Sequence, residues 1–398
     1  MKIKISTLKK VTAVCFVTLF AAFLVIPNTG LPKSKENARL VEQRENRKII
    51  AFPSDTTVSK EFYKQFEKWY QDRLRYKYKL ISAWRKTNFL FGVAVDADMF
   101  LGKDGWFFSR NQCISNFVEP DEKSKYIKTL QKYCNDNGKD FVMMLPPKNE
   151  SVYRDYFPNE IKKLYKAPEY YQKQAEEIFK KNDINYLPLA DAIQLQRKKE
   201  VNDLYFKDDF HWSYYAAAVA SDLLLNKLNM DLKQKFYCGL KLDGSTKDAY
   251  KPCQYLAHFG FAKYDGITRA PWSKQYTNEI YLTDCYTGES EKYTKVFSQV
   301  PLWKITCEGE AIITNKQIDN DIKLLLICDS YTTYMASYLS QSVKQIVLTN
   351  YDICIGKKKE VNIPELIKKY NPDAVALIIL ETSFFHRQFD ELFTDIKF

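Results

Sequence analysis

Histidine is scarce in this chain of 398 residues, which has only three: His211, His258 and His386. No two cysteines are separated by two residues, so the sequence argues against a structural zinc site. It also has no zinc-finger or RNA-binding signature, and its lysines are spread out rather than clustered, so the net charge of +11 does not indicate a nucleic-acid partner. We therefore expect no metal, no cofactor and no nucleic acid in its function.

Apolar residues are plentiful: 45% of the chain is apolar and 15% is aromatic, which allows a sizeable core and argues against global disorder. The length suits one large domain or two modest ones. The excess of lysine suits a surface that faces an anionic envelope polymer or lipid headgroups.

The N-terminus carries a targeting pattern. An uncharged apolar run of about sixteen residues extends from Val11 to Ile26, between the length of a signal-peptide core and a full membrane span. Four lysines precede it: Lys2, Lys4, Lys9 and Lys10. We interpret residues 1–32 as an uncleaved, single-pass signal anchor with an extracytoplasmic domain behind it, because basic residues stay on the cytoplasmic side. A cleaved signal and a buried N-terminal helix are the alternatives.

Export would permit disulfides, and eight cysteines follow the apolar run. Cys238 with Cys253, and Cys285 with Cys307, suit local pairing. Spacing alone does not give the connectivity.

From about residue 120 apolar strands alternate with helical patterns. The strands are predicted at 141–145, 184–189, 323–327, 345–349 and 374–380. The helices are predicted at 121–135, 170–181, 213–228 and 363–370, with one more running from the third strand to Ser340. Fully apolar strands separated by helices indicate an α/β fold of three layers, with a parallel sheet covered on both faces.

The segment 235–320 differs, because it is rich in Tyr, Thr and Gly and alternates in places; we interpret it as a β-rich insertion. Four of its aromatic residues would suit stacking on sugar rings, although ordinary packing is the favoured alternative: Tyr264, Trp272, Tyr276 and Trp303. The predicted order is an anchor, a helical or linker segment packed on the catalytic domain, the first part of that domain, the insertion and the second part: 1–32, 33–118, 119–234, 235–320 and 321–398.

Two short segments carry the chemistry. Asp209 and His211 stand two residues apart just before a predicted helix, and Ser330 follows the apolar run 324–327. These residue types predict an orienting carboxylate, a general base and a nucleophile for acyl transfer. The alternatives are a surface Asp–His pair, a helix cap at Ser330 and a thiol nucleophile at Cys328.

Five motifs in order resemble one family. They are Glu45–Arg47 with Ala51–Pro53, Gly102–Phe108, Pro146–Lys148 with Tyr153 and Pro158, Asp209–Trp212, and Cys328–Tyr331. Together they resemble the SGNH-hydrolase-like polysaccharide O-acetyltransferases of the alginate O-acetylation type (AlgJ/AlgX, DHHW). Cys328 departs from that pattern, because the family usually has glycine there.

The order of the segments supports the same resemblance. In common SGNH hydrolases the serine strand comes first and the Asp/His loop last, whereas here Ser330 follows His211 by about 120 residues. This predicts a circularly permuted order, which the family also has. The site would still form, because it collects at the carboxyl ends of the strands.

An acyl-transfer site also needs donors for an oxyanion. The backbone amide of Ser330 is one candidate, and the loops at Asn350–Tyr351 and Glu381–Ser383 are others. We name Tyr331, Asn350 and Thr382 as candidate oxyanion or substrate-binding residues. The last loop lacks the Asn of the usual SGNH motif, so that donor stays open.

The resemblance implies an O-acetyltransferase that carries acetyl groups on Ser330 to hydroxyls of a cell-envelope or secreted polysaccharide. It also implies a membrane-bound O-acyltransferase partner that delivers the acetyl groups. An acetyl esterase with the same triad, and a non-catalytic anchored protein of polysaccharide assembly, are the alternatives.

Overall fold

The computed structural model describes residues 99–109, 121–164, 169–199, 203–232, 245–252, 265–272, 280–284, 290–293, 310–351, 354 and 361–385, with 60–71 and shorter pieces before residue 89. The chain forms two units: Met1–Val93 with Leu256–Tyr264, and Ala94–Tyr255 with Asp265–Phe398. Several predictions fall outside the described residues or side chains: most of the run 11–26, the motif at 45–53, both cysteine pairs, His258, His386 and the four candidate sugar-stacking aromatics.

The first unit contains helix α3 (Lys60–Gln71). Its aromatic rings lie along one side and contact one another, with ring centroids 6.1 Å apart for Phe62 and Phe66 and 5.5 Å apart for Phe66 and Trp69. None of the helices in the described part of the chain combines the length and the apolar character needed to span a bilayer.

The second unit is built on an eight-stranded sheet with the strand order β4-β3-β12-β10-β11-β9-β7-β8. The strands are β3 (Asp140–Met144), β4 (Tyr186–Leu187), β7 (Ile280–Asp284), β8 (Ser290–Tyr293), β9 (Glu310–Asn315), β10 (Lys323–Cys328), β11 (Gln345–Asn350) and β12 (Ala374–Ile378). The pairs from β4 through β11 are parallel, and β9, β7 and β8 extend the sheet antiparallel.

The α/β prediction is confirmed, with a sheet that is mainly rather than wholly parallel. The central parallel strands are almost entirely apolar and buried, as in β12, where every residue is buried. Strands β7, β8 and β9 come from the segment 235–320, so part of that segment completes the main sheet. Strands β5 (Ser245–Pro252) and β6 (Asp265–Trp272) form a separate antiparallel pair.

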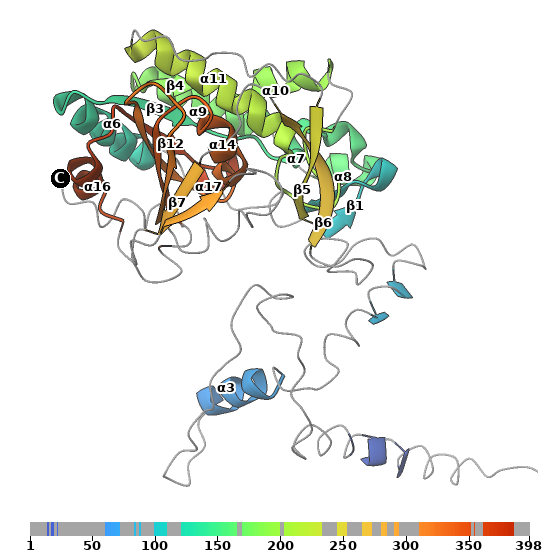
Figure 1. The fold of residues 1–398 in the computed structure, drawn as a ribbon. Coiled ribbons are helices and arrows are strands. Elements are labelled where there is room, and N and C mark those ends of the chain that lie inside the picture. The colour runs from blue at the N-terminus through green and yellow to red at the C-terminus, as the bar shows by residue number, and fades with distance from the viewer. Residues whose placement is uncertain are drawn as a thin grey trace, which may run out of the picture. The chain divides into compact units, whose positions relative to one another are not determined.

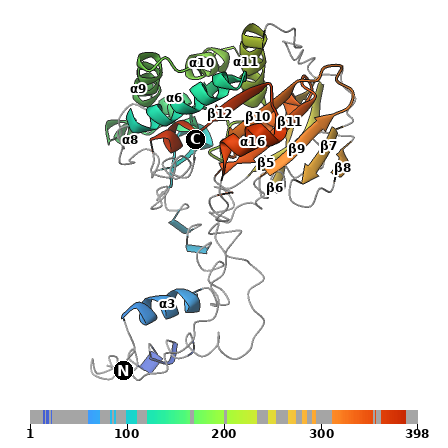
Figure 2. The same cartoon turned by 90° about the vertical axis from the view of Figure 1, so that its left-hand side faces the viewer.

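Helices cover both faces of the sheet (Figures 1 and 2). On one face α11 (Tyr214–Leu232) and α14 (Thr332–Leu339) pack on alternate strand residues such as Leu324 and Leu326. On the other, α6 (Asp121–Asp136), α9 (Glu169–Lys181) and α16 (Ile363–Tyr370) pack on the intervening residues such as Leu325 and Ile327. This alternation follows from the two-residue period of a strand.

Shorter helices complete the unit: α7 (Asn149–Val152), α8 (Asn159–Leu164), α10 (Ala190–Arg197) and α17 (Glu381–Phe384).

The Gly102–Phe108 motif forms a tight turn between β1 (Met99–Leu101) and β2 (Phe107–Ser109). Gly102 has no room for a side chain, because a Cβ there would lie 2.6 Å from both the Phe108 ring and the Tyr156 carbonyl oxygen. Gly105 has φ +79°, in the left-handed region that glycine adopts freely. The buried Trp106 ring stacks on Tyr153 with centroids 3.9 Å apart. Gly102 is therefore required by close packing, and Gly105 by the backbone conformation of the turn.

Candidate functional site

Ser330 lies in the turn between β10 and α14, at the carboxyl end of a strand that lies between β12 and β11 in the parallel part of the sheet. The strand before it is buried from Leu324 to Cys328, whereas Ser330 itself is half-buried. A buried apolar strand that leads into a partly exposed polar turn places the hydroxyl at the sheet edge where such folds form their sites.

Asp209 and His211 lie in a short turn before α11. Tyr205 and Trp212 form an isolated antiparallel bridge at its base. The amide of Ser213 also donates to the Leu204 carbonyl oxygen at 2.8 Å. The turn is thus closed at its base, which fixes the position of the two functional side chains.

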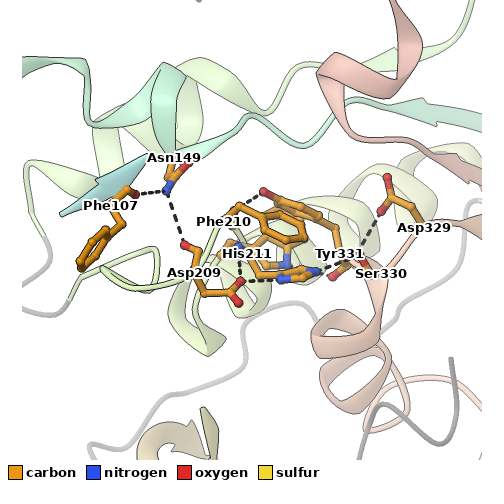
Figure 3. Close-up of polar contacts among 9 residues, drawn as sticks. Phe107, Asn149, Asp209, Phe210, His211, Asp329, Ser330 and Tyr331 are labelled. Carbon is orange, nitrogen blue, oxygen red and sulfur yellow. Dashed lines mark hydrogen bonds and ion pairs between the residues drawn. The ribbon is translucent and has the colours of Figure 1, made fainter. Parts of the chain in front are cut away.

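The structure brings these two turns together (Figure 3). Nε2 of His211 lies 2.8 Å from Oγ of Ser330, and Nδ1 of His211 lies 2.6 Å from Oδ1 of Asp209. The same carboxylate oxygen accepts the backbone amide of His211 at 2.8 Å. The carboxylate is nearly inaccessible at 1% exposure, whereas the imidazole is 15% exposed. The base therefore reaches the surface while its carboxylate partner is shielded from water.

This arrangement has the geometry of a hydroxyl, a base and an orienting carboxylate. With Nδ1–H held by Asp209, the Nε2 lone pair of His211 faces the Ser330 hydroxyl and can take its proton. The carboxylate would stabilise the imidazolium that forms.

Asp329 holds the Ser330 turn in place from inside the fold. Its Oδ1 accepts the amide of Tyr331 at 3.0 Å, and its Oδ2 accepts the amide of Leu380 at 2.7 Å. Through these two hydrogen bonds Asp329 joins the serine turn to Leu380, just beyond the end of β12. Burial raises the pKa of Asp329 to about 6, against the opposing effect of these amides and of His211.

Aromatic residues surround the imidazole. The Tyr331 ring centroid lies 5.3 Å from that of His211, and the ring is wholly buried. Nε1 of Trp212 donates to the Tyr331 carbonyl oxygen at 2.9 Å, and the Tyr331 hydroxyl donates to the Phe210 carbonyl oxygen. The two turns are thus bound to each other on either side of the Ser330–His211 contact. Tyr331, named above as a candidate substrate-binding residue, lies in this packed layer.

The other candidate oxyanion residues lie on neighbouring strands. Asn350 is the last residue of β11, is buried and stands opposite Cys328 in the sheet. Thr382 lies half-buried in the first turn of α17. Their part in binding an oxyanion stays a prediction.

Cys328 is wholly buried, and its thiol donates to the Thr349 carbonyl oxygen at 3.6 Å. The side chain packs between β10 and β11, so the geometry favours the serine rather than this thiol as nucleophile.

Two residues near the site make contacts that the sequence did not predict, although Glu381 begins one of the loops named above. Nδ2 of Asn149 donates to the carbonyl oxygens of Phe107 at 3.3 Å and Asp209 at 3.5 Å (Figure 3). Glu381 is buried and accepts three hydrogen bonds from the segment after β3 and from α9. The only sequence signal for the role of Asn149 was its position directly after the Pro146–Lys148 motif.

Among the described residues, no cluster of three or more His, Cys, Asp and Glu side chains is arranged to hold a metal ion.

Comparison with known proteins agrees with the fold and the motifs. Residues 99–237 match the family model of the SGNH hydrolase-like domain of the acetyltransferase AlgX, so the resemblance to that family is confirmed. No curated protein matches the chain in sequence.

Several solved structures are similar to this chain in fold, among them PatB1 and a DHHW family protein. PatB1 of Bacillus cereus is 16% identical, with a TM-score of 0.54 over 73% of this chain and 99% of its own. A DHHW family protein from Eubacterium siraeum is 13% identical, with a TM-score of 0.53 over 73% of this chain and 92% of its own. At these identities the likeness establishes the fold.

Proposed function

We propose that the protein is an O-acetyltransferase that carries acetyl groups on Ser330 and passes them to hydroxyls of a cell-envelope or secreted polysaccharide. The continuous hydrogen-bonded chain Ser330–His211–Asp209 is the observation that carries this proposal. The match of residues 99–237 to an acetyltransferase family model supports the acetyl group as cargo.

The proposed reaction has two steps. His211 takes the proton of Ser330 while the hydroxyl oxygen attacks the acetyl carbonyl carbon, and the donor's leaving group departs with that proton. A sugar hydroxyl then loses its proton to His211 and attacks the acetyl-serine, which restores the Ser330 hydroxyl.

The order of the segments, with the serine strand after the Asp–His turn, fits a circularly permuted SGNH fold.

The acceptor decides between transferase and esterase, since the same three side chains serve both reactions. The test incubates the purified protein with an activated acetyl ester and an oligosaccharide. We expect acetylated oligosaccharide with the wild type and none with Ser330→Ala. Release of acetate with no transfer to any sugar would make the protein an esterase, and equal transfer by the variant would refute the proposal.

We further propose that the run Val11–Ile26 anchors the chain and leaves the catalytic unit outside the cytoplasm, where a membrane-bound O-acyltransferase delivers acetyl groups. The lysines before the run support this orientation. Protease added to intact, wall-stripped cells should degrade the part beyond Lys33. Protection of that part together with a cytoplasmic marker would show the opposite orientation.

A further inference from the structure

A buried carboxylate that the proposed reaction does not use lies behind the triad. Glu381 is the first residue of α17, directly beyond the end of β12, and is 1% exposed. Its Oε1 accepts the backbone amide of Lys148 at 2.9 Å and the hydroxyl of Ser151. Its Oε2 accepts Nε2 of Gln172 at 2.7 Å. Three donors therefore meet on one carboxyl group, which accepts from all of them in its ionised form because neither oxygen then carries a proton.

The segment that Glu381 holds is connected to the Asp209 turn. The backbone amide of Glu381 donates to the Pro146 carbonyl oxygen at 3.1 Å. Glu381 therefore both donates to and accepts from the segment after β3. Asn149, the next residue after Lys148, donates to the Asp209 carbonyl oxygen at 3.5 Å. Movement of residues 148–149 would therefore move the backbone of the orienting carboxylate.

The residue before Glu381 is connected to the Ser330 turn. The amide of Leu380 donates to Oδ2 of Asp329, whose Oδ1 accepts the amide of Tyr331. A path of hydrogen bonds and covalent links thus runs from the serine turn, through residues 380–381, to Lys148, Asn149 and Asp209. It closes a ring with the Ser330–His211–Asp209 contacts.

We propose that Glu381 is a positioning residue for acyl transfer, which fixes the separation between the Ser330 turn and the Asp209–His211 turn by holding the end of β12 to residues 148–151. This inference rests on the proposed function, since it concerns the same site. Displacing reacting groups by about 1 Å can cost about 10²-fold in rate. A small shift in this buried link is therefore sufficient to slow the reaction.

An amide cannot replace the carboxylate without loss. Glutamine at position 381 would turn an NH₂ group toward the NH₂ group of Gln172. Gln172 is itself fixed, because its Nε2 also donates to the Leu145 carbonyl oxygen at 3.3 Å and its Oε1 accepts the Tyr186 hydroxyl at 3.3 Å. Glu381→Gln therefore disturbs the link while changing the volume little.

The ionisation of Glu381 offers a readout that stability alone does not. Burial raises the pKa of Glu381 to about 7, while its hydrogen-bond donors and the charge of Lys148 act in the opposite direction. The phenols of Tyr186 and Tyr205 also interact electrostatically with it. Activity should therefore include an ionisation of Glu381 in its acid limb.

The experiment measures acetylation of Ser330 by an aryl acetate in stopped flow, across the neutral pH range, with folding checked by thermal unfolding. Glu381→Gln should lower the maximal acylation rate by about 10²-fold, leave KM within a few-fold, and lack one ionisation in the acid limb. The matched control is Glu176→Gln, a half-buried carboxylate of α9 that lies outside the ring and whose pKa is also raised by burial. It should keep the wild-type rate and profile.

The outcomes separate the two claims. A wild type that reacts no faster than Ser330→Ala would remove the proposed function itself. A reactive wild type with an equally reactive, folded Glu381→Gln of unchanged pH profile would overturn the role of Glu381. If Glu381→Gln does not fold, Ser151→Ala decides, because it deletes one of the three donors: a several-fold slower rate supports the role, and a wild-type rate contradicts it.

Discussion

Nε2 of His211 lies 2.8 Å from Oγ of Ser330, although the two residues are 119 positions apart in the chain. They come from different turns, one before α11 and one after β10, and hydrogen bonds on both sides of this contact bind the turns together. The contact is therefore held by the surrounding structure, as acyl transfer requires.

Replacing Asp209 with Asn should slow acetylation of Ser330 by about 10³- to 10⁴-fold, because an amide cannot hold the imidazole in the required tautomer or stabilise its charged form. Asn is close to Asp in size and can keep the amide contact of His211, so the thermal midpoint should change little. Rates from burst kinetics, together with thermal unfolding, test this. A rate within ten-fold of the wild type would argue against the orienting role.

Two buried carboxyl groups should make stability fall as the pH rises from the acid range toward neutrality. The pKa values of Asp329 and Glu381 are raised to about 6 and about 7 by burial, so the folded chain holds protons that the unfolded chain has released. Below the unfolded pKa values the contribution is complete. It is lost as the pH rises from the unfolded pKa values to the folded ones, by up to about 1.4 kcal/mol per pH unit for each group.

Denaturant unfolding at a series of pH values measures this dependence. Between about pH 5 and 7 the free energy of unfolding should fall less steeply with pH in Glu381→Gln than in the wild type, because one titrating group has been removed. Equal slopes for wild type and variant would mean that Glu381 does not titrate in this range.

Gly102→Ala should destabilise the protein by about 1 to 3 kcal/mol, because the new Cβ would overlap the Phe108 ring and the Tyr156 carbonyl oxygen. Gly105→Ala is the matched control in the same turn. It meets nothing within 4 Å and carries only the strain of a positive φ, about 1 kcal/mol. The difference in urea midpoint between the two variants tests the steric argument. Equal losses would show that the turn relaxes around the added methyl.

The sequence predicted the parallel strands well because they are short, buried and apolar on both faces. The predicted runs 323–327 and 345–349 became β10 and β11, each with one more residue at its end. The antiparallel part was harder to predict, because β9 pairs with β7 and β11, each about 30 positions away in the chain. Nothing local shows that they complete the same sheet.

At the site the sequence predicted which residue types act and in what order. Asp209, His211 and Ser330 follow recognisable patterns, since Asp209 and His211 lie in the turn before α11 and Ser330 in the turn after β10. The roles of Asn149 and Glu381 depend on contacts with residues 60 and more positions away, such as Asp209 for Asn149 and Gln172 for Glu381. Such long-range hydrogen bonds leave no periodic signal, so only the folded chain reveals them.

The central claim is that Ser330 forms a covalent acetyl intermediate. The most direct measurement is mass spectrometry of the protein quenched within the burst after mixing with an aryl acetate, followed by peptide mapping. We predict one added acetyl group, located on Ser330, absent from Ser330→Ala and strongly reduced in His211→Ala. An unmodified Ser330 in protein that turns over the ester, or the same acetyl load on Ser330→Ala, would contradict the account.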